Sequence, residues 1–254
     1  MKNKRVPHPG EFTGTVLFLD IRNFLGVTET LTPRETHHFI CKVMEPLTEQ
    51  VRAHGGYVCQ VQGDAVMAVF GGMDSNAAHA EQAVNCAVEQ QRTVGELDPV
   101  AVNGYRLPLS ARTGISSGAL YACENRFSGE STLTVIGRQV NIASRLQEIN
   151  KRYGTKILID ASVFPYINSS IVTRKLDRVN IEGCSGTRDI HEVLGRQDKN
   201  GTHARRKKFY EEGLGHYERG ELDKAIACFS RIGEDRPSYI MIERCKKEKA
   251  AGMA

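Results

Sequence analysis

The sequence lacks any apolar run approaching the roughly 20 residues that cross a bilayer, so no membrane segment is expected in this chain. The basic opening residues lead into the polar stretch 7–11 rather than into the apolar core of a signal peptide. The seven cysteines include no CxxC pair, which argues against a zinc or disulfide framework. Reduced, mostly buried thiols are typical of a cytosolic protein, and we expect a cytoplasmic location.

An excess of one charge is also missing. Lys and Arg number 34 against 30 Asp and Glu, a net charge of +4, and the basic residues are scattered, so nucleic-acid binding is not indicated. The composition is ordinary for a globular protein, and 254 residues allow one sizeable domain with its own core plus an appendage.

Two carboxylates stand at the ends of strand-like runs. Asp20 closes the apolar run 14–19, and Asp64 follows a glycine between the β-prone runs 57–62 and 65–72, a pattern typical of a tight hairpin. A single Asp in a turn more often bonds its own backbone. Two strand ends, however, could present their carboxylates side by side, and such a pair of hard oxygen ligands favours Mg²⁺ or Mn²⁺.

Residues 133–146 form the other informative stretch. A short strand breaks at Gly137 and a helix begins. On that helix Asn141 and Arg145 stand four apart and share a face, while apolar neighbours can face the core. Taken alone, such a pair is better interpreted as part of a solvated helix face.

The remaining pattern predicts an α+β fold with helices on one face of an antiparallel sheet. The expected elements are helices at about 32–54, with a kink or break at Pro46, and at 75–94; a loop at 98–104; strands at 107–115 and 118–122; a hairpin arm or loop at 124–132; strands at 156–160, 171–181 and 187–194; and a short helix capped by Asp160.

A composition shift separates the C-terminal part. We expect an N-terminal lead (1–12), a main domain (13–195), a polar linker (196–203) and a helical tail (204–254) with helices at 208–219, 223–232 and 237–249. Residues 210–229 resemble one tetratricopeptide hairpin, turned at Gly220. One repeat cannot bury its own face, so the tail should pack on the main domain, on a protein partner or on its copy in another subunit. A stabilising cap is at least as good an interpretation as a recruitment role.

Together these stretches resemble the catalytic domain of class III adenylate and guanylate cyclases, over about residues 13–194. Residues 18–24 are similar to the family's first metal motif, 63–67 to its second, and 135–145 to its helix of transition-state residues. Residues 134–137, Thr-Val-Ile-Gly, are most like the bacterial branch called class IIIb. The resemblance implies the ferredoxin-like antiparallel sheet of the nucleotide cyclase fold and conversion of ATP to cyclic AMP and pyrophosphate.

The resemblance also implies a head-to-tail homodimer with sites built from both chains. Asp20 and Asp64, helped by the Ile21 carbonyl, would bind two Mg²⁺ or Mn²⁺ ions, and Asn141 and Arg145 of the other chain would complete the site. Further residues are implied to bind the nucleotide: Phe24 through its backbone amide, Arg112 at the phosphates, and Gln60 with Thr134 at the base. Arg112 is about as well interpreted as a surface charge at a strand end.

The sequence departs from the family pattern at three places. Gln60 stands where cyclases usually carry Lys for adenine or Glu for guanine, and both Gln60 and Thr134 can donate or accept. ATP is expected, while a guanylate or dual-specificity cyclase stays open.

The other two departures concern the phosphates and the dimer. Cys184 replaces a triphosphate-binding Lys, for which Lys175 or Arg188 could compensate, and the loop at 122–127 lacks the usual glycines. These changes leave a further alternative: a catalytically weak, nucleotide-binding homology domain that signals through its tail.

Overall fold

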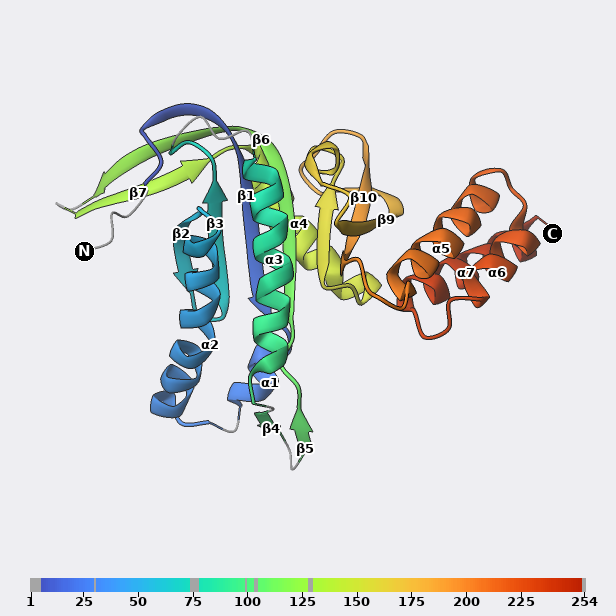
Figure 1. Cartoon of the computed structure of the whole chain (residues 1–254), viewed down its shortest axis with the longest axis horizontal. Helices are drawn as coiled ribbons and strands as arrows, with labels where there is room; N and C mark the ends of the chain where they lie inside the picture. The colour runs from blue at the N-terminus through green and yellow to red at the C-terminus, as the bar shows by residue number, and fades with distance from the viewer. Residues whose placement is uncertain are drawn as a thin grey trace.

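The computed structural model describes residues 6–29, 31–73, 78–98, 100–102, 105–127 and 130–252 (Figure 1). Its strands are β1 (Gly10–Ile21), β2 (Tyr57–Gln62), β3 (Ala65–Phe70), β4 (Val100–Val102), β5 (Tyr105–Leu107), β6 (Ala111–Phe127), β7 (Glu130–Ile136), β8 (Ile157–Asp160), β9 (Ile171–Asn180) and β10 (Thr187–Arg196). Its α-helices are α1 (Phe24–Thr28), α2 (Pro33–Ala53), α3 (His79–Glu96), α4 (Arg138–Tyr153), α5 (Thr202–Glu218), α6 (Leu222–Ser230) and α7 (Arg236–Ala251).

One sheet of eight strands, in the order β2-β3-β1-β6-β8-β10-β9 with β7 paired to β6, forms the centre of the molecule. The α+β fold is as predicted, but the sheet is mixed, because β8 pairs with β6 in parallel while the other described pairs of this sheet are antiparallel. Parallel neighbours need a long crossover connection. Helix α4 supplies it, since it links the β6–β7 hairpin to β8.

Helices cover both faces of the sheet, which corrects the expectation of one covered face. Leu17 and Leu19 of β1 pack in the core beneath α2 and α3, whereas Val16 packs on the opposite face with Ala143 of α4. Successive strand residues point to opposite faces, so the continuous apolar run in β1 is the signature of a strand buried on both sides. Gly114 of β6 lets α4 lie close, because a Cβ there would collide with the Ala143 carbonyl oxygen.

Several local predictions need correction. Helix α2 begins at the predicted Thr32 cap, where Thr32 and Glu35 form a capping box, but it runs past Pro46 without a break. Strands β4 and β5 pair where a loop was expected, and β6 is one continuous strand. Asp160 bonds the Ser162 amide and does not cap the short 3₁₀ helix Phe164–Tyr166. Of the helix predicted at 75–94, the start at 75–77 lies outside the described residues.

The tail helices α5, α6 and α7 pack on the main domain at the end of the sheet formed by β9 (Figure 1). Tyr210 and Phe229 of the tail share one apolar cluster with Tyr153 of α4 and Leu176 of β9. Within this chain, then, the main domain covers the tail. Helix α5 starts six residues earlier than predicted, because the Asp198 carboxylate accepts hydrogen bonds from the first amides of the helix.

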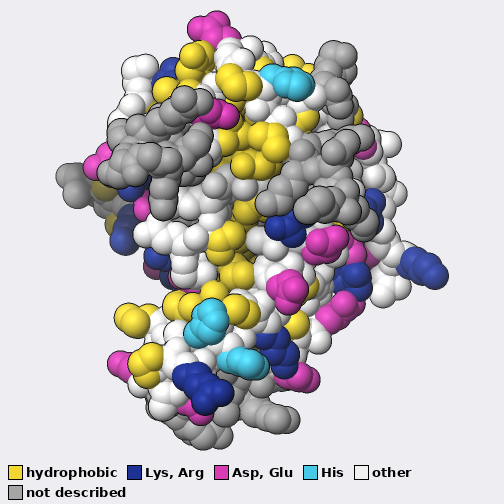
Figure 2. All heavy atoms as spheres, turned by 90° about the vertical axis from the view of Figure 1, so that its left-hand side faces the viewer, with side chains coloured by type: hydrophobic (Ala, Val, Ile, Leu, Met, Phe, Trp, Pro, Cys, Tyr) yellow, Lys and Arg dark blue, Asp and Glu magenta, His cyan; other side chains and the backbone are white. Residues whose placement is uncertain are grey.

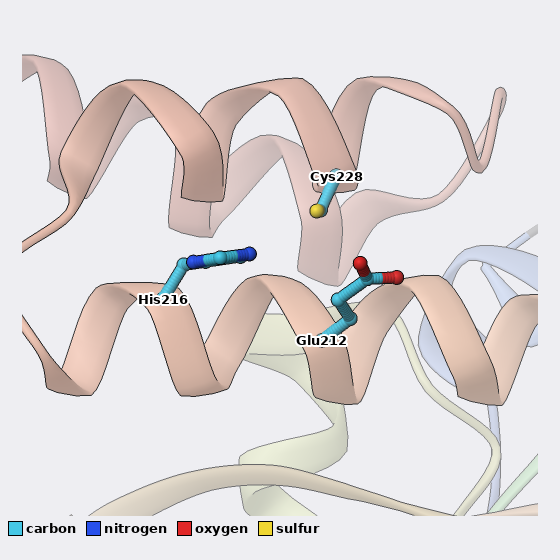
Figure 3. Close-up of side chains that lie close together, drawn as sticks. All are labelled: Glu212, His216 and Cys228. Carbon is cyan, nitrogen blue, oxygen red and sulfur yellow. The ribbon is translucent and has the colours of Figure 1, made fainter.

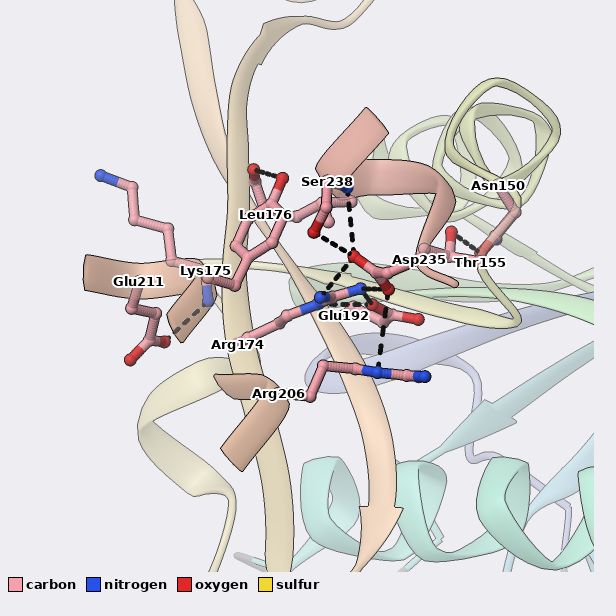
Figure 4. Close-up of polar contacts among 11 residues, drawn as sticks. Asn150, Thr155, Arg174, Lys175, Leu176, Glu192, Arg206, Glu211, Asp235 and Ser238 are labelled. Carbon is pink, nitrogen blue, oxygen red and sulfur yellow. Dashed lines mark hydrogen bonds and ion pairs between the residues drawn. The ribbon is translucent and has the colours of Figure 1, made fainter. Parts of the chain in front are cut away.

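A buried arginine anchors the tail (Figure 4). Arg174 of β9 is fully buried; its Nε donates to Glu192 of β10 at 2.8 Å, and its two Nη atoms donate to Asp235 at 2.9 and 2.7 Å. Asp235 in turn caps α7, and the guanidinium lies 4.4 Å from the centre of the Tyr210 ring. Although burial opposes it, the bonds from Arg174 hold the pKa of Asp235 below its usual range. The Asp235 carboxylate at the start of α7 is therefore neutralised by an arginine from the sheet of the main domain.

A second buried contact joins the tail to the end of α4. The Tyr153 hydroxyl donates to Asp177 of β9 at 2.6 Å, and Arg244 of α7 donates to the same carboxylate at 3.0 and 2.5 Å. Arg236 also donates to the Arg152 carbonyl at 3.2 Å. The tail thus holds the C-terminal turn of α4 as well as the sheet.

Replacing Arg174 by Met should lower the free energy of unfolding by about 3–5 kcal/mol, because Glu192 and Asp235 would stay buried without the guanidinium that bonds both, and Arg206 reaches Asp235 only at 3.8 Å. The matched control is Arg178→Met on the same strand, whose side chain is 63% exposed in its pair with Asp189. It should change stability little. Urea unfolding of both variants measures the difference, and equal effects would contradict this account of the tail.

Candidate active site

The pairing of β1 with β3 brings Asp20, near the end of β1, close to Asp64, which directly precedes β3. Asp20 lies opposite Ala65, the residue directly after Asp64, and the Ile21 amide donates to the Asp64 carbonyl at 3.2 Å. The backbone register therefore holds the two acidic residues close together, as the strand pattern of the sequence predicted.

The burial of the two acids is only partly compensated by neighbouring groups. Oδ1 of Asp20 is buried and accepts no hydrogen bond. Burial raises the pKa of Asp20, the charge of Asp64 raises it further, and Arg112 opposes both. Burial likewise raises the pKa of Asp64 against the hydrogen bonds of nearby amides. An unpartnered carboxylate oxygen beside a second acid is the arrangement that a hard divalent cation would satisfy, so these residues fit the predicted metal ions.

These carboxylates line a cleft of about 1040 Å³. Five of the nine predicted site residues line it: Asp20, Ile21, Phe24, Asp64 and Arg112. Asn23, with a left-handed backbone (φ 59°), turns the chain from β1 into α1, so that the start of α1 also lines the cleft. Arg112 lies opposite Asp20 on the neighbouring strand β6.

Three further cations line the cleft that sequence reasoning did not identify: Arg22, Lys151 and Lys156. Lys151 is in the last turn of α4, and Lys156 precedes β8, where its carbonyl accepts from the Thr113 amide at 2.7 Å. No motif marks either lysine, because only the packing of α4 and β8 beside β6 brings them to Asp20. With four cations around two acids, the cleft suits a polyanion such as a triphosphate.

The other four predicted residues lie outside the cleft. Gln60 is exposed on β2, and its amide donates to Gln62 at 3.4 Å, while Thr134 is half-buried on β7, the strand that lies against β2. Asn141 is exposed on α4. Arg145 makes surface ion pairs with Glu148 and Glu182 at 2.8 and 3.2 Å, and such exposed pairs hold a side chain only weakly. A single chain thus separates the predicted residues into two groups.

Lys175 and Arg188, the two cations that could compensate for the lysine missing at Cys184, each have a partner within this chain. Cys184 follows β9 and packs against the apolar cluster that contains the tail. Lys175 pairs with Glu218 at 3.0 Å, and Arg188 lies 3.5 Å from the buried Asp160, so both candidates for compensation have other partners. Neither of them lines the cleft, whereas Lys151 and Lys156 do.

Residues 10–195 match the family described as the adenylate and guanylate cyclase catalytic domain. This chain belongs to that family. It is 29% identical over 245 residues to the adenylate cyclase, terminal-differentiation specific, of Dictyostelium discoideum, covering 91% of this chain and 11% of the relative. It is 30% identical over 182 residues to adenylate cyclase 1 of Rhizobium meliloti, covering 71% of this chain and 27% of the relative.

The cyclase fold is also found in solved structures. The guanylate cyclase domain of RhGC from Catenaria anguillulae, in complex with GTP, aligns with a TM-score of 0.63 at 24% identity, covering 73% of this chain and 98% of that domain. This cyclase chain spans only a small part of the first two relatives, so their full architectures are not represented in it. None of its described helices combines the length and apolar character needed to span a membrane.

The two half-buried acids predict that stability rises either when the charge of Asp20 is removed or when a cation binds. Because the folded-state pKa of Asp20 lies above its ordinary value of 3.8, the ionised carboxylate costs stability as pH rises through that raised pKa, and the full cost is present at neutral pH. Asp20→Asn should therefore raise the melting temperature of metal-free protein at pH 7 by a few degrees and abolish most of the further rise that Mn²⁺ gives the wild type.

The matched control is Asp98→Asn, whose side chain is 85% exposed in its pair with Lys42. It should leave both the melting temperature and the Mn²⁺ response unchanged. A Mn²⁺ shift that persists in Asp20→Asn would show that the cation binds elsewhere.

Proposed function

We propose that this cyclase is an adenylate cyclase that converts ATP to 3′,5′-cyclic AMP and pyrophosphate at the interface of a head-to-tail homodimer. One observation carries the proposal: the cleft of one chain is lined by the two acids and four cations, whereas Gln60, Asn141 and Arg145 lie outside it. A complete site then requires the second group from another copy.

Exposed apolar side chains beside the second group support a partner surface. Val61 next to Gln60 is 45% exposed, Ile136 near Thr134 is 55% exposed, and Tyr121, opposite Ile136 in the β6–β7 hairpin, is 44% exposed. Figure 2 looks at the side of the molecule where β2 forms the edge of the sheet, and a band of hydrophobic side chains runs down this face. Contiguous apolar surface of this kind favours a protein interface.

Within the cleft, Asp20, Asp64 and the Ile21 carbonyl would hold Mg²⁺ or Mn²⁺, two ions per site. Such ions, when bound, promote ionisation of the ribose 3′-hydroxyl and neutralise charge on the phosphates. Arg112, Lys151 and Lys156 bind the triphosphate oxygens, and the amides at Phe24 add hydrogen bonds.

The second copy supplies the remaining groups. Its Asn141 orients the ribose so that the 3′-oxygen faces the α-phosphorus. As the new oxygen–phosphorus bond forms and the bond to pyrophosphate breaks, its Arg145 stabilises the negative charge that gathers on the α-phosphate oxygens. The surface ion pairs of Arg145 are weak enough to be exchanged for this contact.

Base selection rests on Gln60 and Thr134, since a donor to N1 and an acceptor for N6 would read adenine. The two relatives at about 30% identity are adenylate cyclases, which supports ATP. A guanylate or dual-specificity cyclase is the second candidate, favoured by the ability of both side chains to donate and accept. The replacement at Cys184 favours a weakly active, nucleotide-binding homology domain, against which stand Lys151 and Lys156.

We also propose a cytoplasmic location for the enzyme and a stabilising role for its tail. Cys41, Cys59, Cys86, Cys184, Cys228 and Cys245 are free thiols, which supports a reducing, cytoplasmic environment. The tail buries its apolar face on the main domain, so we favour a stabilising cap over recruitment of a protein partner.

Purified protein should form cyclic AMP from ATP with Mn²⁺ or Mg²⁺ and less cyclic product from GTP, measured by chromatography of the products. Asp64→Ala should lower the rate at least 100-fold, because one cation ligand is lost. Asp98→Ala, at an exposed site, is the control and should keep the rate. More cyclic GMP than cyclic AMP would establish the second candidate, and nucleotide binding without any cyclic product would establish the homology domain.

A further inference from the structure

Three side chains with metal-binding atoms meet in the tail, away from the cleft. Glu212 and His216 stand four apart on α5 and share one face, and Cys228 of α6 faces them. One donor atom from each, a carboxylate oxygen, an imidazole nitrogen and the thiol sulfur, lie within 4.8 Å of one another. Figure 3 shows the imidazole and the carboxylate on either side of the sulfur, between the two helices.

The histidine is oriented by a fourth residue. Nδ1 of His216 lies 2.6 Å from Oε2 of Glu221, which can only accept, and 3.0 Å from Nη2 of Arg219, which can only donate. We assign the proton to Nδ1 on the shorter of these two contacts, the one to Glu221. The other nitrogen, Nε2, is then available as a ligand. Glu221 is itself held by Arg219 at 3.2 Å and Lys224 at 2.7 Å. Histidines that bind metals almost always donate their second nitrogen to such an oxygen, which fixes the ring.

We propose that Glu212, His216 and Cys228 form a binding site for Zn²⁺, with water as the fourth ligand. A thiolate with an imidazole and a carboxylate suits this borderline ion and disfavours Mg²⁺ or Ca²⁺, which take oxygen ligands. Glu212 is exposed and Cys228 is buried, so the site opens toward solvent on one side only.

The distances require a small rearrangement. With metal–ligand bonds of roughly 2.0–2.3 Å, tetrahedral ligand atoms lie roughly 3.3–3.6 Å apart, so the donor atoms would close in by about 1 Å. Side-chain rotation of Glu212 and Cys228 can supply this movement without displacing either helix. Binding would release the thiol proton and would link α5 to α6, which stabilises the tail that caps the catalytic domain.

This site differs chemically from the cation site of the cleft, where Asp20 and Asp64 offer oxygen and no cysteine is among the lining residues. Cobalt(II) distinguishes the two, because a thiolate ligand gives an intense near-ultraviolet charge-transfer absorption that oxygen ligands do not give. Cobalt(II) absorption therefore tests the zinc site independently of cyclase activity.

The test is a titration of the purified, reduced full chain with Co²⁺ in saturating Mg²⁺, followed by Zn²⁺. We expect one equivalent of thiolate–cobalt absorption, lost on addition of Zn²⁺. Cys228→Ser should abolish it, and His216→Gln should weaken Co²⁺ binding at least 10-fold. Cys245→Ser, at a buried cysteine of α7 outside the cluster, is the matched control and should retain it.

Glu221→Gln tests the orienting contact and should weaken Co²⁺ binding about 10- to 100-fold, without removing a ligand. Circular dichroism checks that each variant is folded, and the more exposed Glu212→Gln replaces Cys228→Ser if the latter unfolds. The proposal would be overturned if the wild type gave no thiolate–cobalt absorption. It would also be overturned if the absorption persisted in folded Cys228→Ser or kept its full strength in Glu212→Gln.

Discussion

The backbone register between β1 and β3 is the constraint on which the site depends. It places Asp20 opposite Ala65 and lets the Ile21 amide donate to the Asp64 carbonyl. The two acids therefore lie close together, half-buried, at the ends of neighbouring strands. Burial opposes the ionisation of both acids, and the charge of Asp64 adds to this effect at Asp20. A fold that keeps both acids there carries a cost in stability that the proposed divalent cations would relieve.

Helix α4 connects this cleft to the tail. Its early turns carry Asn141 and Arg145, its last turn brings Lys151 to the cleft, and Tyr153 at its end bonds Asp177, which Arg244 of the tail also binds. Gly114 allows the helix to lie directly on β6. The tail is thus one of the supports that set the position of α4.

The sequence predicted those parts of the site that follow from local pattern. The Gly63-Asp64 hairpin, the strand before Asp20 and the helix after Gly137 each have a short-range signature, and the structure has all three elements. Predicting the parallel pairing of β6 with β8 and the covering of both faces was harder, because these depend on which way a crossover helix packs. Lys151 and Lys156 could not be predicted for the same reason, because no motif marks them and only the three-dimensional packing brings them to the cleft that Asp20 lines.

The central claim is that each active site draws on two chains, and complementation tests it most directly. Asp64→Ala and Arg145→Ala remove one group from each side of the interface, so each variant alone should be nearly inactive. When the two are co-expressed in equal amounts, half of the dimers are mixed and each mixed dimer holds one intact site of two, so activity should recover to about a quarter of the wild type. If the co-expressed variants form dimers but stay as inactive as either variant alone, the shared site is contradicted.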